Sequence, residues 1–188
     1  MKKILIVLLV FFCFLFASWA EDEWPLAVEG GIPLLFPLGD FAEFSQFSGG
    51  LGAQVLFSPA IHKDLEGLGF FGNVQLLSNS TVLEGTSLTS LGLSIGAEYK
   101  LSPPGPEALS FSFLAGLGLF SHFSDGIWNA TSTGPQAFLD TFAPIAVGIH
   151  WSFGDIGEII LRGRYHVFLE SGNTGQLLGT ELAYRYSL

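Results

Sequence analysis

Large apolar residues alternate with small or polar residues through most of the chain after residue 25. The alternation forms eight runs of about ten residues, in which most alternate side chains are Leu, Ile, Val, Phe, Trp or Tyr. The runs cover residues 26–34, 51–58, 68–76, 90–99, 109–119, 145–153, 158–167 and 178–188. Because successive side chains of a β-strand point to opposite faces, a period of two predicts strands with one apolar face. We therefore expect an all-β protein.

The composition of the two faces decides which of them lies outside. In the fifth run, Phe111 and Phe113 alternate with Ser110 and Ser112, and elsewhere the polar face is mostly Gly, Ala and Ser. A soluble barrel or sandwich, the alternative, has a solvated face rich in Lys, Glu and Asp. Backbone groups in lipid must all be paired, which a sheet achieves only as a closed barrel. The pattern thus predicts an eight-stranded antiparallel up-and-down transmembrane β-barrel with its apolar face toward lipid.

The connections between the runs differ in length. Those at 59–67, 102–107 and 154–157 tend to be short, and those at 37–49, 78–89 and 121–137 are longer. On the side of the longer connections only the last, at 170–176, is brief. This asymmetry is typical of outer-membrane barrels, whose turns and termini are periplasmic. Lys63 and Lys100 lie in or beside the short turns. An aromatic girdle is predicted at the same side, formed by Trp24, Tyr99, Trp151, Phe153, Tyr184 and Tyr186.

The N-terminal residues have the layout of a secretory signal peptide cleaved after Ala20. Lys2 and Lys3 precede thirteen consecutive apolar residues, and small residues follow at the cleavage site. An uncleaved anchor helix is the alternative, but a spanning helix needs about 20 apolar residues. We expect a signal peptide at 1–20 and an outer-membrane β-barrel domain at 21–188.

The composition narrows the class further. The 188 residues are 49% hydrophobic and only 13% charged, which excludes a disordered chain. Seventeen acidic and seven basic residues give a net charge of −10, which excludes a nucleic-acid partner held through phosphate contacts. The single cysteine, Cys13, lies in the expected signal peptide, so no disulfide is expected in the mature chain.

Two further features accompany the eight runs: a Pro-Leu-Gly-Asp-Phe corner at 37–41 and a terminal run, L-x-Y-x-Y-x-L, at 182–188. Together these resemble the small eight-stranded outer-membrane barrels, such as the transmembrane domain of outer membrane protein A and its relatives X and W. The resemblance spans 21–188. It implies a monomer in a Gram-negative-type outer membrane, with outer-membrane lipid and the barrel-assembly machinery as partners. The terminal run resembles the signal read by that machinery, although those barrels usually end in an aromatic residue and this chain ends in Leu188.

Charged residues cluster on the face predicted to line the lumen. They are Glu29, Glu98, Glu158, Glu181, Arg162, Arg164, Arg185, His150 and His166. A hairpin of the last two runs would bring Glu181 opposite Arg162 or Arg164, and Arg185 close to Glu158. One interpretation is a gate or binding site, and the favoured one is a neutralised network filling a narrow lumen.

Four large apolar residues also have inward parity, all at the long-loop ends of their strands: Leu77, Phe120, Phe168 and Leu177. One interpretation is an apolar mouth like that of the W-type barrels, whose relatives are thought to admit small hydrophobic compounds. The favoured interpretation is a hydrophobic plug at the base of the loops.

Candidate catalytic and metal sites are weak. His150 and His166, on neighbouring strands, would be able to approach each other, but no third metal ligand is evident. Ser121 and His122 are neighbours in sequence and therefore face opposite sides of a strand, which disfavours base-activated nucleophilic attack. No nucleotide or zinc motif is present. We expect no metal, no cofactor and no enzymatic activity.

The sequence therefore predicts an integral outer-membrane barrel with a structural or surface-interaction role and a lumen closed by charges. The first alternative is a narrow channel for small hydrophobic molecules, and the second is a lipid-modifying enzyme. No motif identifies an extracellular partner, because variable loops carry such contacts.

Overall fold

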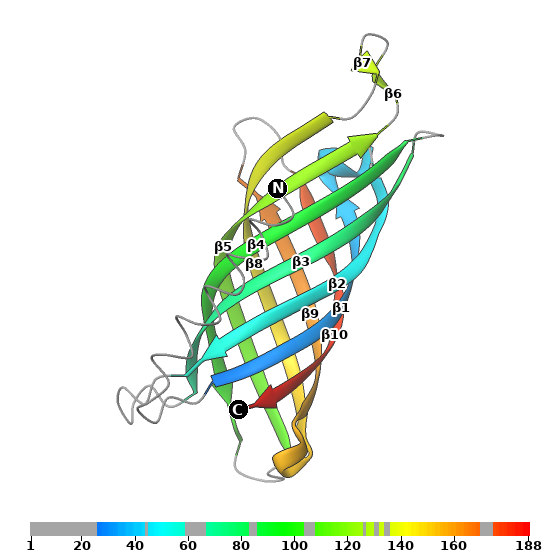
Figure 1. Ribbon diagram of the computed structural model, residues 1–188. Coiled ribbons are helices and arrows are strands. Elements are labelled where there is room, and N and C mark those ends of the chain that lie inside the picture. The colour runs from blue at the N-terminus through cyan, green and yellow to red at the C-terminus, as the bar shows by residue number, and fades with distance from the viewer. Residues whose placement is uncertain are drawn as a thin grey trace.

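The computed structural model describes residues 26–43, 45–58, 67–82, 86–103, 108–125, 127–129, 132–133, 136–169 and 175–188. In these residues eight strands close into one antiparallel barrel, in the order β1-β10-β9-β8-β5-β4-β3-β2 (Figure 1). The strands are β1 (Leu26–Leu38), β2 (Ser45–Phe57), β3 (Leu68–Thr81), β4 (Ser87–Leu101), β5 (Leu109–Asp125), β8 (Gln136–Ser152), β9 (Glu158–Phe168) and β10 (Gln176–Ser187). Two short strands, β6 (Ile127–Asn129) and β7 (Ser132–Thr133), form a separate hairpin. The predicted eight-stranded up-and-down barrel is confirmed.

The two ends of the barrel are different. One, here called the turn end, holds the C terminus and the 3-10 turn Gly154–Ile156 between β8 and β9. Gly154 and Gly157 have φ values of +64° and +131°, a region that only glycine adopts readily, so this tight turn depends on them. The other, the loop end, holds the 3-10 helix Gly39–Glu43 and the β6–β7 hairpin (Figure 1).

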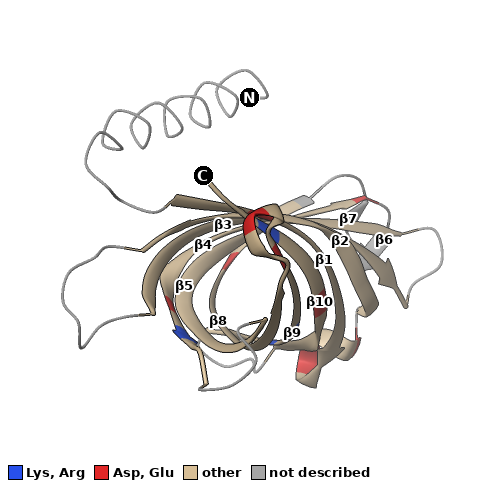
Figure 2. Ribbon diagram, turned by 90° about the horizontal axis from the view of Figure 1, so that it is seen from below, with Lys and Arg blue, Asp and Glu red and all other residues tan. Residues whose placement is uncertain are grey.

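Side chains alternate between the lumen and the outer surface as the sequence predicts. Seen along its axis, the sheet closes on itself around the lumen (Figure 2). Leu51, Ile95 and Leu117 point outward and are 67%, 72% and 62% exposed, whereas Arg162 and His150 are fully buried inside. The alternative of a soluble barrel with its apolar face inside is therefore wrong for the described residues.

Several strands extend well beyond the predicted runs. β5 and β8 each have 17 residues, whereas crossing a bilayer takes about 9–11. Much of the predicted loop at 121–137 is consequently strand, as are parts of 37–49 and 78–89. In these segments small polar and aromatic residues form the hydrogen-bonded pairs between neighbouring strands. Strict apolar alternation is lost there, so a pattern search ends the strand too early.

The predicted aromatic girdle lies on the outer surface near the turn end. Its described members, all exposed, are Tyr99, Trp151, Phe153, Tyr184 and Tyr186. The Tyr184 hydroxyl donates a hydrogen bond to the Ile156 carbonyl of the turn. Trp24, Lys63 and the expected signal peptide at 1–20 lie outside the described residues. No helix in the described ranges is long and apolar enough to cross a membrane.

Candidate functional site in the barrel lumen

Glutamate, arginine and lysine side chains meet inside the turn-end half of the barrel. They come from four strands: Glu29 of β1, Glu98 and Lys100 of β4, Glu158, Arg162 and Arg164 of β9, and Glu181 and Arg185 of β10. The β9–β10 register places Glu181 opposite Arg162 and Arg185 opposite Glu158. We call this set, with His150, the charged network.

Arg162 is the centre of the charged network. Its Nη1 donates to Glu29 Oε1 and its Nη2 to Glu29 Oε2 at 2.8 Å, so the two planar groups meet fork to fork. Nη1 also lies 3.2 Å from Glu181 Oε2. Both partners of the Arg162–Glu29 pair are almost completely buried. A buried arginine of this kind is tolerated only because several carboxylates surround it.

The charged network also spans the lumen. Arg185 Nη2 lies 2.9 Å from Glu98 Oε1 and 2.7 Å from Oε2, although β10 and β4 are four places apart in the eight-stranded ring and thus on opposite walls. Arg164 Nη1 lies 3.0 Å from Glu181 and 3.4 Å from Gln75 Oε1 of β3, which is again the opposite wall. Side chains therefore bridge the lumen from wall to wall at this level.

Lys100 and His150 extend the charged network toward the turn end. Lys100 pairs with Glu158, and His150 Nδ1 lies 3.0 Å from the same carboxylate, while His150 Nε2 lies 2.8 Å from Ser112 Oγ. From the sequence we placed Lys100 in or beside the short turns. We missed that Lys100 lies two residues after Glu98 on one strand, so that both side chains point into the lumen. With Lys100 included, four carboxylates face four cations. A cavity of about 150 Å³ opens beside these groups at the turn end.

His166 lies away from the charged network, contrary to the prediction. Its ring centroid is 5.1 Å from that of Phe142, and its Nδ1 has no hydrogen-bond partner among the described residues. His150 lies opposite Ile160 and His166 opposite Pro144, so six register positions, about 20 Å, separate the two rings along the strands. The expected approach of the two histidines is therefore wrong. Within the described residues, no group of three metal-ligating side chains is positioned to hold an ion.

Space for the Arg162 side chain comes from the neighbouring strand. Gly148 of β8 lies directly opposite Arg162, as the small residues of that run predict. A Cβ at position 148 would lie 2.8 Å from Ser112 Oγ and 3.2 Å from Arg162 Cγ. A larger side chain must therefore displace the guanidinium or the strand.

Gly148→Val is expected to lower the free energy of unfolding by about 1–3 kcal/mol, because overpacking of a filled interior costs that much. Urea unfolding of the detergent-folded barrel measures the change. Gly72→Val is the matched control, since a Cβ at this outward glycine meets nothing within 4 Å. Equal stability of the two variants would contradict the tight packing around Arg162.

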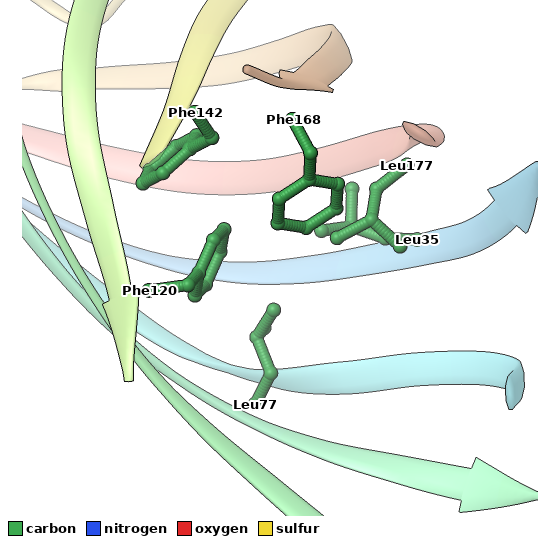
Figure 3. Packing of buried hydrophobic residues seen from close by; sticks show 6 residues of the cluster. All are labelled: Leu35, Leu77, Phe120, Phe142, Phe168 and Leu177. Atoms are coloured by element: carbon green, nitrogen blue, oxygen red, sulfur yellow. The ribbon is translucent and has the colours of Figure 1, made fainter. Parts of the chain in front are cut away.

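An apolar cluster fills the lumen at the loop end. The predicted residues Leu77, Phe120, Phe168 and Leu177 all belong to it, together with Leu35 and Phe142. Figure 3 shows the six side chains pointing toward one another from six strands. The centroids of Phe120 and Phe142 are 4.3 Å apart, and the partly buried Phe41 packs on Phe168 at 5.5 Å. Leu35 and Phe142 were not among the predicted residues, although Leu35 lies one position beyond its run, as the four predicted residues do.

A chain of polar side chains lies beyond the apolar cluster, on five neighbouring strands. We call it the polar girdle: Ser48, Asn79, Ser90, His122 and Asp140. Ser48 Oγ donates to Asn79 Oδ1, and Asn79 Nδ2 donates to Ser90 Oγ at 2.8 Å. Ser90 Oγ lies 2.7 Å from His122 Nδ1, and His122 Nε2 lies 3.1 Å from Asp140 Oδ2.

Sequence reasoning missed the polar girdle. It compared His122 with its chain neighbour Ser121, whereas the partner is Ser90, directly opposite on β4. The signal available in the sequence was that Ser90, His122 and Asp140 all occupy alternate positions whose side chains point into the lumen. That signal becomes specific only when the strand register is known.

A closed eight-stranded barrel with an apolar outer surface and a charged lumen is the architecture of the small outer-membrane barrels. Solved structures of that kind share the fold of this chain. Neisserial surface protein A (NspA) has a TM-score of 0.59 at 10% identity, covering 85% of this chain and 96% of that chain. Ail, the attachment invasion locus protein of Yersinia pestis, in complex with the heparin analogue sucrose octasulfate, has a TM-score of 0.54 at 12% identity, covering 87% and 99%. The outer membrane enzyme PagL has a TM-score of 0.53 at 14% identity, covering 85% and 98%.

No family model matches the chain, and no curated protein matches its sequence. At 10–14% identity the structural likeness establishes the fold and leaves the activity open. The predicted resemblance to small eight-stranded outer-membrane barrels is confirmed for the fold.

Proposed function

We propose that this protein is an integral outer-membrane barrel with a closed lumen and a structural or surface-interaction role. The observation that carries the proposal is that apolar side chains lie outside and charged side chains inside, the reverse of a soluble protein. Large apolar side chains cover the outward face of the strands, and almost all described cations and their carboxylate partners lie inside. Soluble monomers rarely expose apolar patches beyond a few hundred Å². A lipid bilayer is the environment that accommodates an apolar outer surface of this size.

Two barriers support a lumen that does not conduct. The charged network bridges opposite walls through the Arg185–Glu98 and Arg164–Gln75 contacts. The apolar cluster then packs six buried side chains across the loop end. An eight-stranded barrel is only wide enough for side chains to fill, so both layers favour a lumen that is closed to hydrated ions.

In this proposal the turn end faces the periplasm and the loop end faces outward. A signal peptide at 1–20 is removed after Ala20, the barrel-assembly machinery inserts the chain, and the barrel is a monomer in outer-membrane lipid. The loop-end connections at 37–49, 78–89, 121–137 and 170–176 together contain five acidic residues and no Lys or Arg. A surface partner is therefore expected to be neutral or cationic, and a heparin-like polyanion such as the ligand solved with Ail is not favoured.

The purified protein is expected to migrate faster on a gel when unheated than after boiling, and to produce no conductance steps in a planar bilayer. Heat-modifiable migration reports a folded, detergent-resistant barrel, and conductance reports the state of the lumen. N-terminal sequencing of the membrane fraction is expected to start at Glu21. Stable ion-conducting steps from the heat-modifiable form would contradict the closed lumen.

A narrow channel for small hydrophobic molecules is the second candidate. The feature in its favour is the apolar path from the partly exposed Phe41 to the apolar cluster. Passage requires the packed phenyl rings of Phe120, Phe142 and Phe168 to separate. Vesicles loaded with an apolar fluorophore quencher test this: faster entry with the barrel than with empty vesicles supports the channel.

A further inference from the structure

Three members of the polar girdle follow one another at close distance in the order serine, histidine and aspartate, as in a catalytic triad. We propose that Ser90, His122 and Asp140 form a serine-esterase site that acts on neutral esters with an apolar acyl group. This goes beyond the outer-membrane role proposed above, and it replaces the expectation, drawn from sequence, of no enzymatic activity. A triad is recognised by geometry and roles, since it recurs on unrelated folds in different chain orders.

The nucleophile and base are held by strand pairing. Ser90 of β4 and His122 of β5 are directly opposite each other, and the Ser90 hydroxyl reaches His122 Nδ1 at 2.7 Å. Asp140 Oδ2 lies 3.1 Å from the other ring nitrogen, Nε2, as a charge contact and not as an aligned hydrogen bond. A carboxylate at Nε2 favours the tautomer with the proton there, which leaves Nδ1 free to accept the serine proton. Both Ser90 and His122 are buried, which fixes their rotamers.

Asn79 supplies a hydrogen-bond donor beside the nucleophile. Its Nδ2 lies 2.8 Å from Ser90 Oγ, and the Ser48 hydroxyl donates to its Oδ1, which orients the NH2 group toward Ser90. Asn79 Nδ2 also donates to the Leu88 carbonyl at 3.0 Å, so both of its N–H groups are engaged. Its bond to Ser90 Oγ stabilises negative charge on that oxygen as the hydroxyl proton leaves. The site thus contains a nucleophile, a base, a nearby carboxylate and an amide that holds the nucleophile in place.

The reaction balances with water as the second substrate. Ser90 Oγ attacks the ester carbonyl carbon while its proton passes to His122 Nδ1. The tetrahedral intermediate collapses, the bond from carbon to the alcohol oxygen breaks, and His122 returns the proton to the departing alcohol. Water then attacks the acyl-serine, gives a proton to His122, and releases the carboxylic acid as Ser90 regains its hydrogen.

The surroundings of the triad indicate the substrate class. Phenyl rings flank His122: the Phe41, Phe120 and Phe138 centroids lie 5.9, 5.4 and 4.9 Å from its ring. These rings suit an apolar acyl chain. No described Lys or Arg belongs to the polar girdle or the apolar cluster, so a phosphorylated headgroup finds no counter-charge there. Phe41 is only partly buried and packs beside His122, and in this proposal its ring moves aside to admit the ester.

The test uses a fluorophosphonate probe, which reacts covalently with activated serines, on the folded barrel in detergent. We expect labelling at Ser90, identified by peptide mass spectrometry, and its loss in Ser90→Ala. His122→Gln should slow labelling about 100-fold or more, as loss of a general base does. Phe41→Ala should speed labelling. Ser94→Ala is the matched control, since this buried serine lies four residues, or two periods of the alternation, away on the same strand.

Hydrolysis of p-nitrophenyl butyrate should follow the same order across the variants. The proposal is overturned if neither the wild-type barrel nor Phe41→Ala is labelled, if labelling survives in Ser90→Ala, or if neither protein hydrolyses the ester before treatment with the probe. Heat-modifiable migration of every variant shows separately that the barrel is folded. Failure of the esterase site therefore leaves the outer-membrane proposal standing.

Discussion

Arg162→Leu is expected to lower the free energy of unfolding by about 3–5 kcal/mol, because removal of one partner leaves buried charges without compensation. Arg162 contacts Glu29, Glu98 and Glu181, so three carboxylates lose a cation at once. Urea titration of the barrel folded in liposomes, read from the heat-modifiable band, measures the effect.

Arg164→Leu provides the comparison. Its Nη1 contacts one carboxylate, that of Glu181, and the neutral Gln75, so the loss of stability should be smaller than for Arg162→Leu. The pair Arg162→Met with Glu29→Gln should recover part of the loss, since it removes charge of both signs. Wild-type stability in Arg162→Leu would show that the charged network contributes little to folding.

The second large effect is expected on the outer surface. Ile95→Arg should destabilise the liposome-folded barrel by about 2–4 kcal/mol, the cost of a basic residue near the middle of a bilayer. Ile95 is 72% exposed and lies at the centre of the fourth apolar run. In a water-soluble barrel the same change would be neutral or favourable.

Phe153→Arg is the control for the depth of the substituted residue in the bilayer. This residue is exposed at the turn end, where a charge reaches the interface and costs about 0–1 kcal/mol. The difference between the two arginine variants isolates the membrane contribution from any general cost of replacing an apolar residue. Equal stabilities of Ile95→Arg and Phe153→Arg would place the outer face in water.

Much of this fold follows from local pattern. The period of two sets the face of nearly every residue, and the contrast between Leu-rich and Ser- or Gly-rich faces sets which face is enclosed. The short β9–β10 connection limited the partner of Glu181 to Arg162 or Arg164, and the structure pairs it with Arg162. These properties depend on residues near in sequence, which explains why they were predictable.

Contacts across the lumen were not predictable in the same way. Arg185 meets Glu98 because β10 and β4 lie on opposite walls at one height, a property of ring closure and strand stagger. The Ser90–His122 pair depends on the β4–β5 register, which the connection at 102–107 does not specify. Lys100 was misassigned because a residue beside a turn can also be the last inward residue of a strand.

The 17-residue length of β5 and β8 has a consequence for how the molecule meets its surroundings. At about 3.4 Å per residue and a tilt of about 40°, such strands rise about 44 Å, against about 30 Å of hydrocarbon. Part of this wall therefore stands above the lipid as hydrogen-bonded sheet. An antibody or a protein on another cell that binds this part of the wall would contact a rigid, hydrogen-bonded sheet. Substitutions in this sheet would readily weaken such binding.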